Sequence, residues 1–157
     1  MSLAAGDPAL VRVGERVTHV ARYTREDIAR FATLTGDRNP VHQDADAARR
    51  ARLPDVIASG QHTSALMSGL AATHFSRRDD GVAREMLCLN FNFAYQQPVL
   101  PERDVAMAWE VREVEWNESL QGYIAQLAGE ARQGDALAVV ARGTVLVRAA
   151  RPAAAPA

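Results

Sequence analysis

The chain has 157 residues, 48% of them hydrophobic and 24% charged, and its 18 basic and 19 acidic side chains leave a formal net charge of −1. That length supports one domain with a real core, and the charge balance argues against a protein that binds nucleic acid through bulk positive charge. All 18 basic residues are arginine, which excludes a catalytic lysine, a Schiff base and a Walker-type phosphate loop. The single cysteine, Cys88, excludes an intrachain disulfide and is expected to be an inert core thiol.

The start of the sequence does not predict a secretory signal. Residues 1–10 have no basic segment and no long apolar segment of the kind that begins a secretory signal. Every apolar stretch falls well short of the ~20 residues that span a bilayer. We therefore expect a cytoplasmic protein with no membrane partner. Residues 149–157 are Ala and Pro with one Arg and are predicted to be a disordered tail, which leaves residues 1–148 as a single domain.

The first half of the chain predicts one strand followed by helices. Residues 13–20 alternate loosely and predict a strand, and residues 25–34 recur at helical spacing behind a near-capping box at Thr24. Gly36 is a typical stop for that helix. Residues 44–51 are expected to form one or two further helical turns.

Residues 60–75 form the longest helical candidate, and it lacks a strong polar face. A helix that is apolar on most sides is a buried helix. Its small residues, Ala65, Gly69 and Ala72, would let other backbone elements approach closely.

The second half predicts strands over residues 86–95, 105–112, 121–132 and 137–148, separated by turns. In the first of these, alternation places Leu87, Leu89, Phe91 and Phe93 on one face. Consecutive long strands imply an antiparallel sheet, and a single buried helix implies that the sheet wraps around it, an α+β fold. Because the helix would keep an uncovered side, we expect a second copy to cover it in a homodimer.

The sharpest local feature is the loop Asp37-x-Asn39-Pro40-x-His42. Pro40 stiffens it, since the ring fixes one backbone angle and restricts the residue before it. The carboxylate and the imidazole can both hydrogen-bond one water, and histidine titrates near neutral pH. The pattern is a candidate acid–base pair, although an Asp and a His at this spacing also occur together by chance.

The second feature is the start of the long helix, Ser59-Gly60. Free backbone N–H groups at a helix N-terminus attract a developing oxyanion, and Gly60 has no side chain to block a ligand carbonyl. The plainer alternative is that Ser59 or Gly60 merely caps the helix.

Taken together, these motifs resemble the MaoC-like dehydratases, a family that includes the (R)-specific enoyl-CoA hydratases of the hotdog fold. The resemblance rests on residues 35–42, on Asp44 and Ala47, and on residues 57–60 and 68–70 of the long helix. It extends more weakly to residues 89–93, Pro98-Val99 and the later strands.

The resemblance implies a hotdog fold and a hydro-lyase that adds water to, or removes it from, an enoyl or 3-hydroxyacyl thioester, with acyl-CoA as the expected substrate. It assigns Asp37 and His42 as the catalytic pair and Gly60 as the oxyanion donor. Neither a metal nor a redox cofactor is required. Substrate contacts are expected from Asn39, Ser59, Gln61 and His62.

The sequence also departs from the family pattern. The family often has a His immediately before the helix-opening Gly, where this chain has Ser59, and Gln61, His62 and Thr63 replace the usual apolar residues. The departure bears on the substrate, because Gln61 and His62 would lie near the acyl tunnel and a bulky or polar acyl chain becomes possible. A hydrogen-bonded core histidine is the alternative interpretation of His62.

Three other functions remain open from the sequence. A hotdog thioesterase would need a carboxylate on the central helix, and residues 60–75 contain no Asp or Glu. A non-catalytic acyl-thioester-binding protein would leave Asp37 and His42 without a role. An iron site built from His42 and Asp44 with His62 or His74 would imitate the two-His-one-carboxylate pattern.

Overall fold

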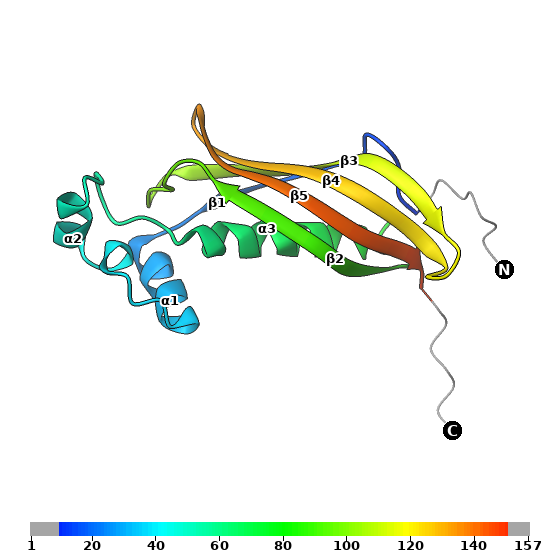
Figure 1. Cartoon of the computed structure of the whole chain (residues 1–157), viewed down its shortest axis with the longest axis horizontal. Helices are drawn as coiled ribbons and strands as arrows, with labels where there is room; N and C mark the ends of the chain where they lie inside the picture. Colours follow the sequence, from blue (N-terminus) through cyan, green and yellow to red (C-terminus); the bar gives the residue numbers. More distant parts are fainter. Residues whose placement is uncertain (1–9, 151–157) are drawn as a thin grey trace, which may run out of the picture.

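The computed structural model describes residues 10–150, and they form a curved sheet with one long helix along its inner side (Figure 1). The strands are β1 (Arg16–Arg22), β2 (Arg84–Tyr95), β3 (Asp104–Asn117), β4 (Gly122–Gln133) and β5 (Ala136–Ala149). All pairings are antiparallel and the strand order is β1-β3-β4-β5-β2. The predicted α+β architecture, a sheet wrapped around a helix, is confirmed.

The helices are α1 (Arg25–Thr35), the 3-10 turn η1 (Pro40–His42), α2 (Ala45–Arg50) and α3 (Gly60–Phe75). The predicted limits of α3 are confirmed at both ends, and α1 extends one residue further than expected. Thr24 and Asp27 form the complete capping box, and Gly36 ends α1 in the left-handed conformation with φ 72°. Figure 1 shows α1 and α2 together at one end of the molecule, beside the N-terminal end of α3.

The core lies between α3 and the concave face of the sheet. Met67, Ala71 and Phe75 lie along the buried side of α3, and Met67 and Phe75 are at most 1% exposed. Burial of each large apolar side chain contributes about 2 kcal/mol. Trp109, on β3, joins the two layers through its indole Nε1, which donates to the carbonyl oxygen of Met67 at 2.8 Å.

Three strand predictions need correction. The strand expected over residues 105–112 is β3, which continues to Asn117. The first strand begins at Arg16 rather than residue 13, because Gly14 adopts a positive φ of 82° and turns the chain. On β2, Cys88 pairs with Val145 and Asn90 pairs with Thr144, so Leu89 is an extra residue in a β-bulge.

The bulge reverses the side-chain alternation along β2. As a result, Leu87 lies on the opposite face from Phe91 and Phe93, and the expectation of one shared face is wrong. Leu87 and Leu89 are each about half exposed, whereas Phe91 and Phe93 pack against the core. Cys88 is exposed as well, so the predicted core thiol is also wrong.

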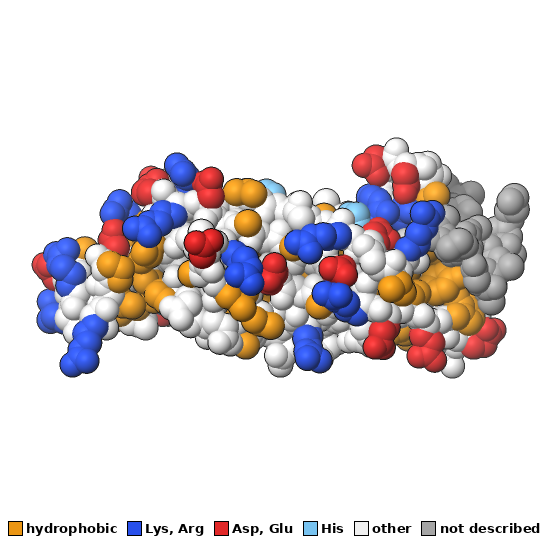
Figure 2. Space-filling model, turned by 90° about the horizontal axis from the view of Figure 1, so that it is seen from above, with side chains coloured by type: hydrophobic (Ala, Val, Ile, Leu, Met, Phe, Trp, Pro, Cys, Tyr) orange, Lys and Arg blue, Asp and Glu red, His pale blue; other side chains and the backbone are white. Residues whose placement is uncertain are grey.

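The outer face of the sheet carries mixed charge. Basic and acidic side chains are interspersed across it in Figure 2. No helix within residues 10–150 is long and apolar enough to cross a bilayer. Of the predicted disordered tail, Ala149 ends β5 and the Ala150 amide donates to the carbonyl of Ala83, while residues 151–157 lie outside the described part.

Candidate active site

The loop after α1 brings Asp37 and His42 face to face. Their side chains approach to 3.3 Å between Asp37 Oδ2 and His42 Nε2. The imidazole is 8% exposed and the carboxylate 31% exposed, so solvent or a small ligand reaches the pair from the carboxylate side. The structure therefore brings the two predicted acid–base residues together.

Local backbone bonds explain why this loop holds its shape. The Asp37 amide donates to the carbonyl of Ala32, near the end of α1, and this bond holds the start of the loop against the helix. The Asp37 carboxylate accepts from the Asn39 amide at 3.0 Å. The Asn39 side chain in turn accepts from the Val41 amide and caps η1, where Pro40 occupies the first turn. Asn39 thus shapes the loop that presents His42.

The other ring nitrogen fixes the tautomer of His42. Nδ1 lies 2.7 Å from the carbonyl oxygen of Ile57, and a carbonyl only accepts, so Nδ1 carries the proton. In the neutral ring, Nε2 then directs a lone pair towards the Asp37 carboxylate. Two acceptors at this separation are satisfied by a proton or by a water that donates to both.

The bond to Ile57 also ties the loop to the start of α3. Ile57 lies three residues before Gly60, and the amides of Ile57 and Ala58 donate to the carbonyls of Val41 and Val99. The segment between the loop and the helix is therefore fixed on both sides. The N–H groups of Gly60 and Gln61, the first two of α3, have no acceptor inside the helix, whereas the His62 N–H donates to the Ser59 carbonyl at 3.0 Å.

Ser59 is the N-cap residue of α3, but its side chain makes no capping hydrogen bond to the backbone. Instead its hydroxyl donates to Gln61 Oε1 at 2.6 Å. Ser59 is therefore the N-cap by position, but its side chain does not bond the helix backbone, and the N–H groups of Gly60 and Gln61 are left without a side-chain cap.

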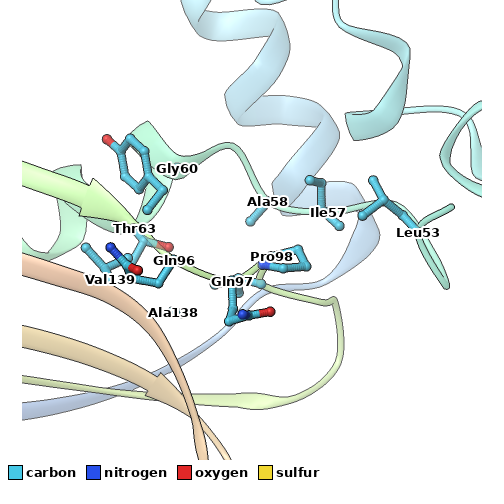
Figure 3. Close-up of a pocket in the computed structure, with 12 residues that line it drawn as sticks. Leu53, Ile57, Ala58, Gly60, Thr63, Gln96, Gln97, Pro98, Ala138 and Val139 are labelled. Atoms are coloured by element: carbon cyan, nitrogen blue, oxygen red, sulfur yellow. The ribbon is translucent and has the colours of Figure 1, made fainter. Parts of the chain in front are cut away.

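A largely apolar cavity of about 340 Å³ opens beside Gly60. Figure 3 shows Thr63, Gln96 and Val139 grouped at one end of the lining, Gln97 and Pro98 near its middle, and Ile57 and Leu53 at the other end. Tyr95 also lines this cavity, and its hydroxyl lies 2.7 Å from Ser64 Oγ. No sequence pattern points to Tyr95, because its contact with α3 joins residues 31 positions apart.

The structure separates His62 from this group. The His62 ring stacks between Tyr23 and Phe31 and lines a different cavity, between β1, α1 and α3. Its Nδ1 is buried without a partner, and its ring makes no hydrogen bond within residues 10–150, so the interpretation as a hydrogen-bonded core histidine is wrong.

The iron alternative is not supported. Residues 10–150 contain no group of three or more His, Cys, Asp or Glu side chains placed to hold a metal ion. His74, the other histidine of that alternative, instead bonds to Glu15 at 2.7 Å.

Comparison with known proteins adds an independent line of evidence. The sequence model of a family described as "MaoC like domain" matches residues 6–127. The mitochondrial 3-hydroxyacyl-[acyl-carrier-protein] dehydratase FERN of Solanum lycopersicum is 27% identical over 74 residues, which cover 47% of this chain and 45% of that protein. The chain therefore matches less than half the length of this relative.

Solved structures share the whole architecture. The (R)-hydratase from A. caviae involved in PHA biosynthesis aligns with a TM-score of 0.74 at 25% identity, over 86% of this chain and 96% of that one. R-hydratase PhaJ1 from Pseudomonas aeruginosa aligns with a TM-score of 0.72 at 23% identity, over 94% and 91%. The fold of this chain is the hotdog fold of these proteins.

Proposed function

Because the chain belongs to the MaoC-like domain family, we propose that it is a hydro-lyase that adds water to an enoyl thioester or removes water from a 3-hydroxyacyl thioester. The observation that carries this proposal is the facing pair Asp37 and His42, held by the Ile57 carbonyl at the entrance to α3. Acyl-CoA is the substrate that we propose.

The proposed chemistry follows from where charge develops. Conjugation with the thioester makes the β-carbon of an enoyl group electrophilic. A water that donates to both Asp37 and His42 loses a proton to the pair as its oxygen bonds to that carbon, and the α-carbon then receives a proton from the same pair. The two side chains act as one coupled unit.

Gly60 has the second role in this proposal. Water attack places enolate charge on the thioester oxygen, and the Gly60 N–H with the positive end of the α3 dipole would stabilise it. Loss of one such donor typically costs ~3 kcal/mol of barrier. The reaction moves only a hydroxyl group and protons, so we propose that it uses no metal or redox cofactor.

We further propose that two copies associate through β2. This strand is at the edge of the sheet, is 12 residues long, and exposes Leu87 and Leu89 to about 50%. A long apolar edge strand is a template for pairing with another chain. We also propose a cytoplasmic location, which the sequence predicts and the fold leaves open.

The test is incubation of the purified protein with crotonyl-CoA while the absorbance of the conjugated thioester and the free thiol are both followed. Loss of absorbance without thiol release is expected. Thiol release would instead indicate a thioesterase, and binding with neither change would indicate a carrier without catalysis. A parallel assay with the crotonyl thioester of an acyl carrier protein compares the two carriers.

A further inference from the structure

The cavity beside Gly60 has uncharged walls. Within residues 10–150, no Asp, Glu, Arg or His side chain lines it. Most of the wall is apolar and comes from the segment before α3, from residues 98–99 and from β5. A charged group would lose its hydration in this cavity without gaining a partner. The cavity therefore suits an uncharged part of a ligand.

Four side chains of the lining carry polar groups, and two of them are uncommitted. The hydroxyl groups of Thr63 and Tyr95 each lie within hydrogen-bond distance of another side chain, at 3.0 Å and 2.7 Å. The carboxamides of Gln96 and Gln97 make no hydrogen bond within the described residues. Each carboxamide offers N–H donors and an acceptor oxygen to an incoming molecule.

The backbone holds both glutamines against β5. The amides of Gln96 and Gln97 both donate to the carbonyl of Ala138, at 2.8 Å and 3.4 Å. In Figure 3, Gln96 lies beside Thr63, and Gln97 lies beside Pro98 nearer the middle of the lining. Two carboxamides are thus placed one after the other along the same cavity.

The proposed reaction centre decides which part of a substrate this cavity holds. Asp37 and His42 are not among the described residues that line it, but His42 Nδ1 lies 2.7 Å from the carbonyl oxygen of Ile57, which does. The β-carbon must reach the catalytic pair while the thioester carbonyl meets the Gly60 N–H. An acyl chain inside the cavity would carry its β-carbon away from the pair, so the cavity is left for the thiol side of the thioester.

On this basis, and resting on the function proposed above, we infer that the cavity binds the pantetheine arm of the substrate and that Gln96 and Gln97 hydrogen-bond its amides. Pantetheine is uncharged and carries two secondary amides in series. A carboxamide complements a secondary amide, because each has both a donor and an acceptor. Acyl-CoA and acyl carrier protein thioesters share this arm, so the cavity recognises their common part and leaves the phosphate groups outside.

The experiment compares crotonyl-pantetheine with the S-propyl thioester of crotonic acid, which lacks both amides. In the wild-type protein, kcat/KM is expected to be higher for crotonyl-pantetheine. Gln96→Leu and Gln97→Leu remove the hydrogen bonds at similar side-chain size, and the ratio of the two kcat/KM values is expected to fall ~3-fold in each variant and ~10-fold in the double variant. Gln126→Leu, at an exposed position on β4, is the control and should leave the ratio unchanged.

The two carriers are then tested with the double variant. Crotonyl-CoA and the crotonyl thioester of an acyl carrier protein contain the same arm, so kcat/KM should fall by about the same factor for both. A loss confined to crotonyl-CoA would mean that the glutamines meet its nucleotide, and a loss confined to the protein thioester would mean that they meet the carrier surface. Either result would overturn the inference.

Two results with the small thioesters would overturn it as well. An equal loss for both would mean that the cavity holds the crotonyl chain they share, and an unchanged ratio would mean that no amide meets the glutamines. The single variants provide the same comparison if the double variant fails to fold. Crotonyl-CoA hydration by the wild type tests the proposed function separately, and the Kd of crotonyl-pantetheine for wild type and variants tests the cavity even in a protein that does not turn over.

Discussion

The ring of Tyr95 lies directly against the Cα of Gly60. A Cβ at residue 60 would come within 2.7 Å of Tyr95 Cε1 and 2.8 Å of Cδ1. The Tyr95 hydroxyl lies within hydrogen-bond distance of Ser64 Oγ, and the Ser64 hydroxyl donates to the Gly60 carbonyl at 3.1 Å. One side chain from the end of β2 thus fixes the first turn of α3, and only glycine leaves room for its ring.

Gly60→Ala is therefore expected to displace either the Tyr95 ring or the start of α3. The substitution keeps the backbone N–H but moves it, and a displacement of about 1 Å in an active site can cost ~10²-fold in rate. We expect kcat/KM for crotonyl-CoA to fall by that order. In Tyr95→Ala the same Gly60→Ala change should cost much less, because the clashing ring is gone. Equal costs in the two backgrounds would show that the ring does not position Gly60.

Asp37→Asn and His42→Ala are each expected to lower kcat by at least ~10²-fold without unfolding the protein, in line with the loss of a general acid or base. Circular dichroism and thermal unfolding check the fold. The matched controls are Asp135→Asn and His19→Ala, both at exposed positions away from the loop. Near-full activity in a folded variant would remove that residue from the mechanism.

The tautomer of His42 is a prediction that needs no substrate. Since Nδ1 donates to the Ile57 carbonyl at 2.7 Å, the neutral ring should carry its proton on Nδ1, the less common tautomer of free histidine side chains. Nitrogen chemical shifts of isotope-labelled histidine measure this directly, with His42→Ala to assign the signal. A neutral His42 protonated on Nε2 would contradict the geometry of the pair.

A second ionic cluster, at the far end of α3, predicts the acid sensitivity of the fold. Burial alone would raise the pKa of Glu15, but hydrogen bonds from His74, the Arg12 amide and Arg77 outweigh it and hold the pKa at about 2, below the ordinary 4.5. A depressed folded-state pKa adds stability above the unfolded value, and that stability disappears as the pH falls from about 4.5 towards 2.

Glu15→Gln should therefore lower the free energy of unfolding at pH 7 by on the order of 2 kcal/mol, and it should flatten the loss of stability between pH 5 and pH 2. Urea unfolding at a series of pH values measures both effects. Glu113→Gln, at an exposed position on β3, serves as the control. A variant that loses stability with acid as steeply as the wild type would show that Glu15 is not the titrating group.

If two copies pair through β2, a charge placed on that strand should halve the mass of the particle in solution. Leu89→Arg places a charge at the bulge on the β2 edge, where Leu89 is 49% exposed in the single chain, and it should shift the protein from dimer to monomer in sedimentation or light scattering. Leu120→Arg, in the turn between β3 and β4 and 41% exposed, should leave the mass unchanged. A dimer that persists in Leu89→Arg would move the interface away from this strand.

The sequence by itself determined the local elements whose signals lie within a few residues. The capping box at Thr24, the stop at Gly36 and the apolar helix Gly60–Phe75 were all predictable, because capping and helical periodicity depend on near neighbours. The motif from Asp37 to His42 was also visible, since its spacing and its proline are local.

Only the tertiary structure decided which distant groups meet. The bulge at Leu89, the exposure of Cys88, the ring of Tyr95 over Gly60 and the stacking of His62 between Tyr23 and Phe31 depend on strand register and on contacts between elements far apart in the chain. A one-residue shift in register reverses every side chain that follows it, and the sequence pattern of one strand does not show where its pairing with the neighbouring strand skips a residue.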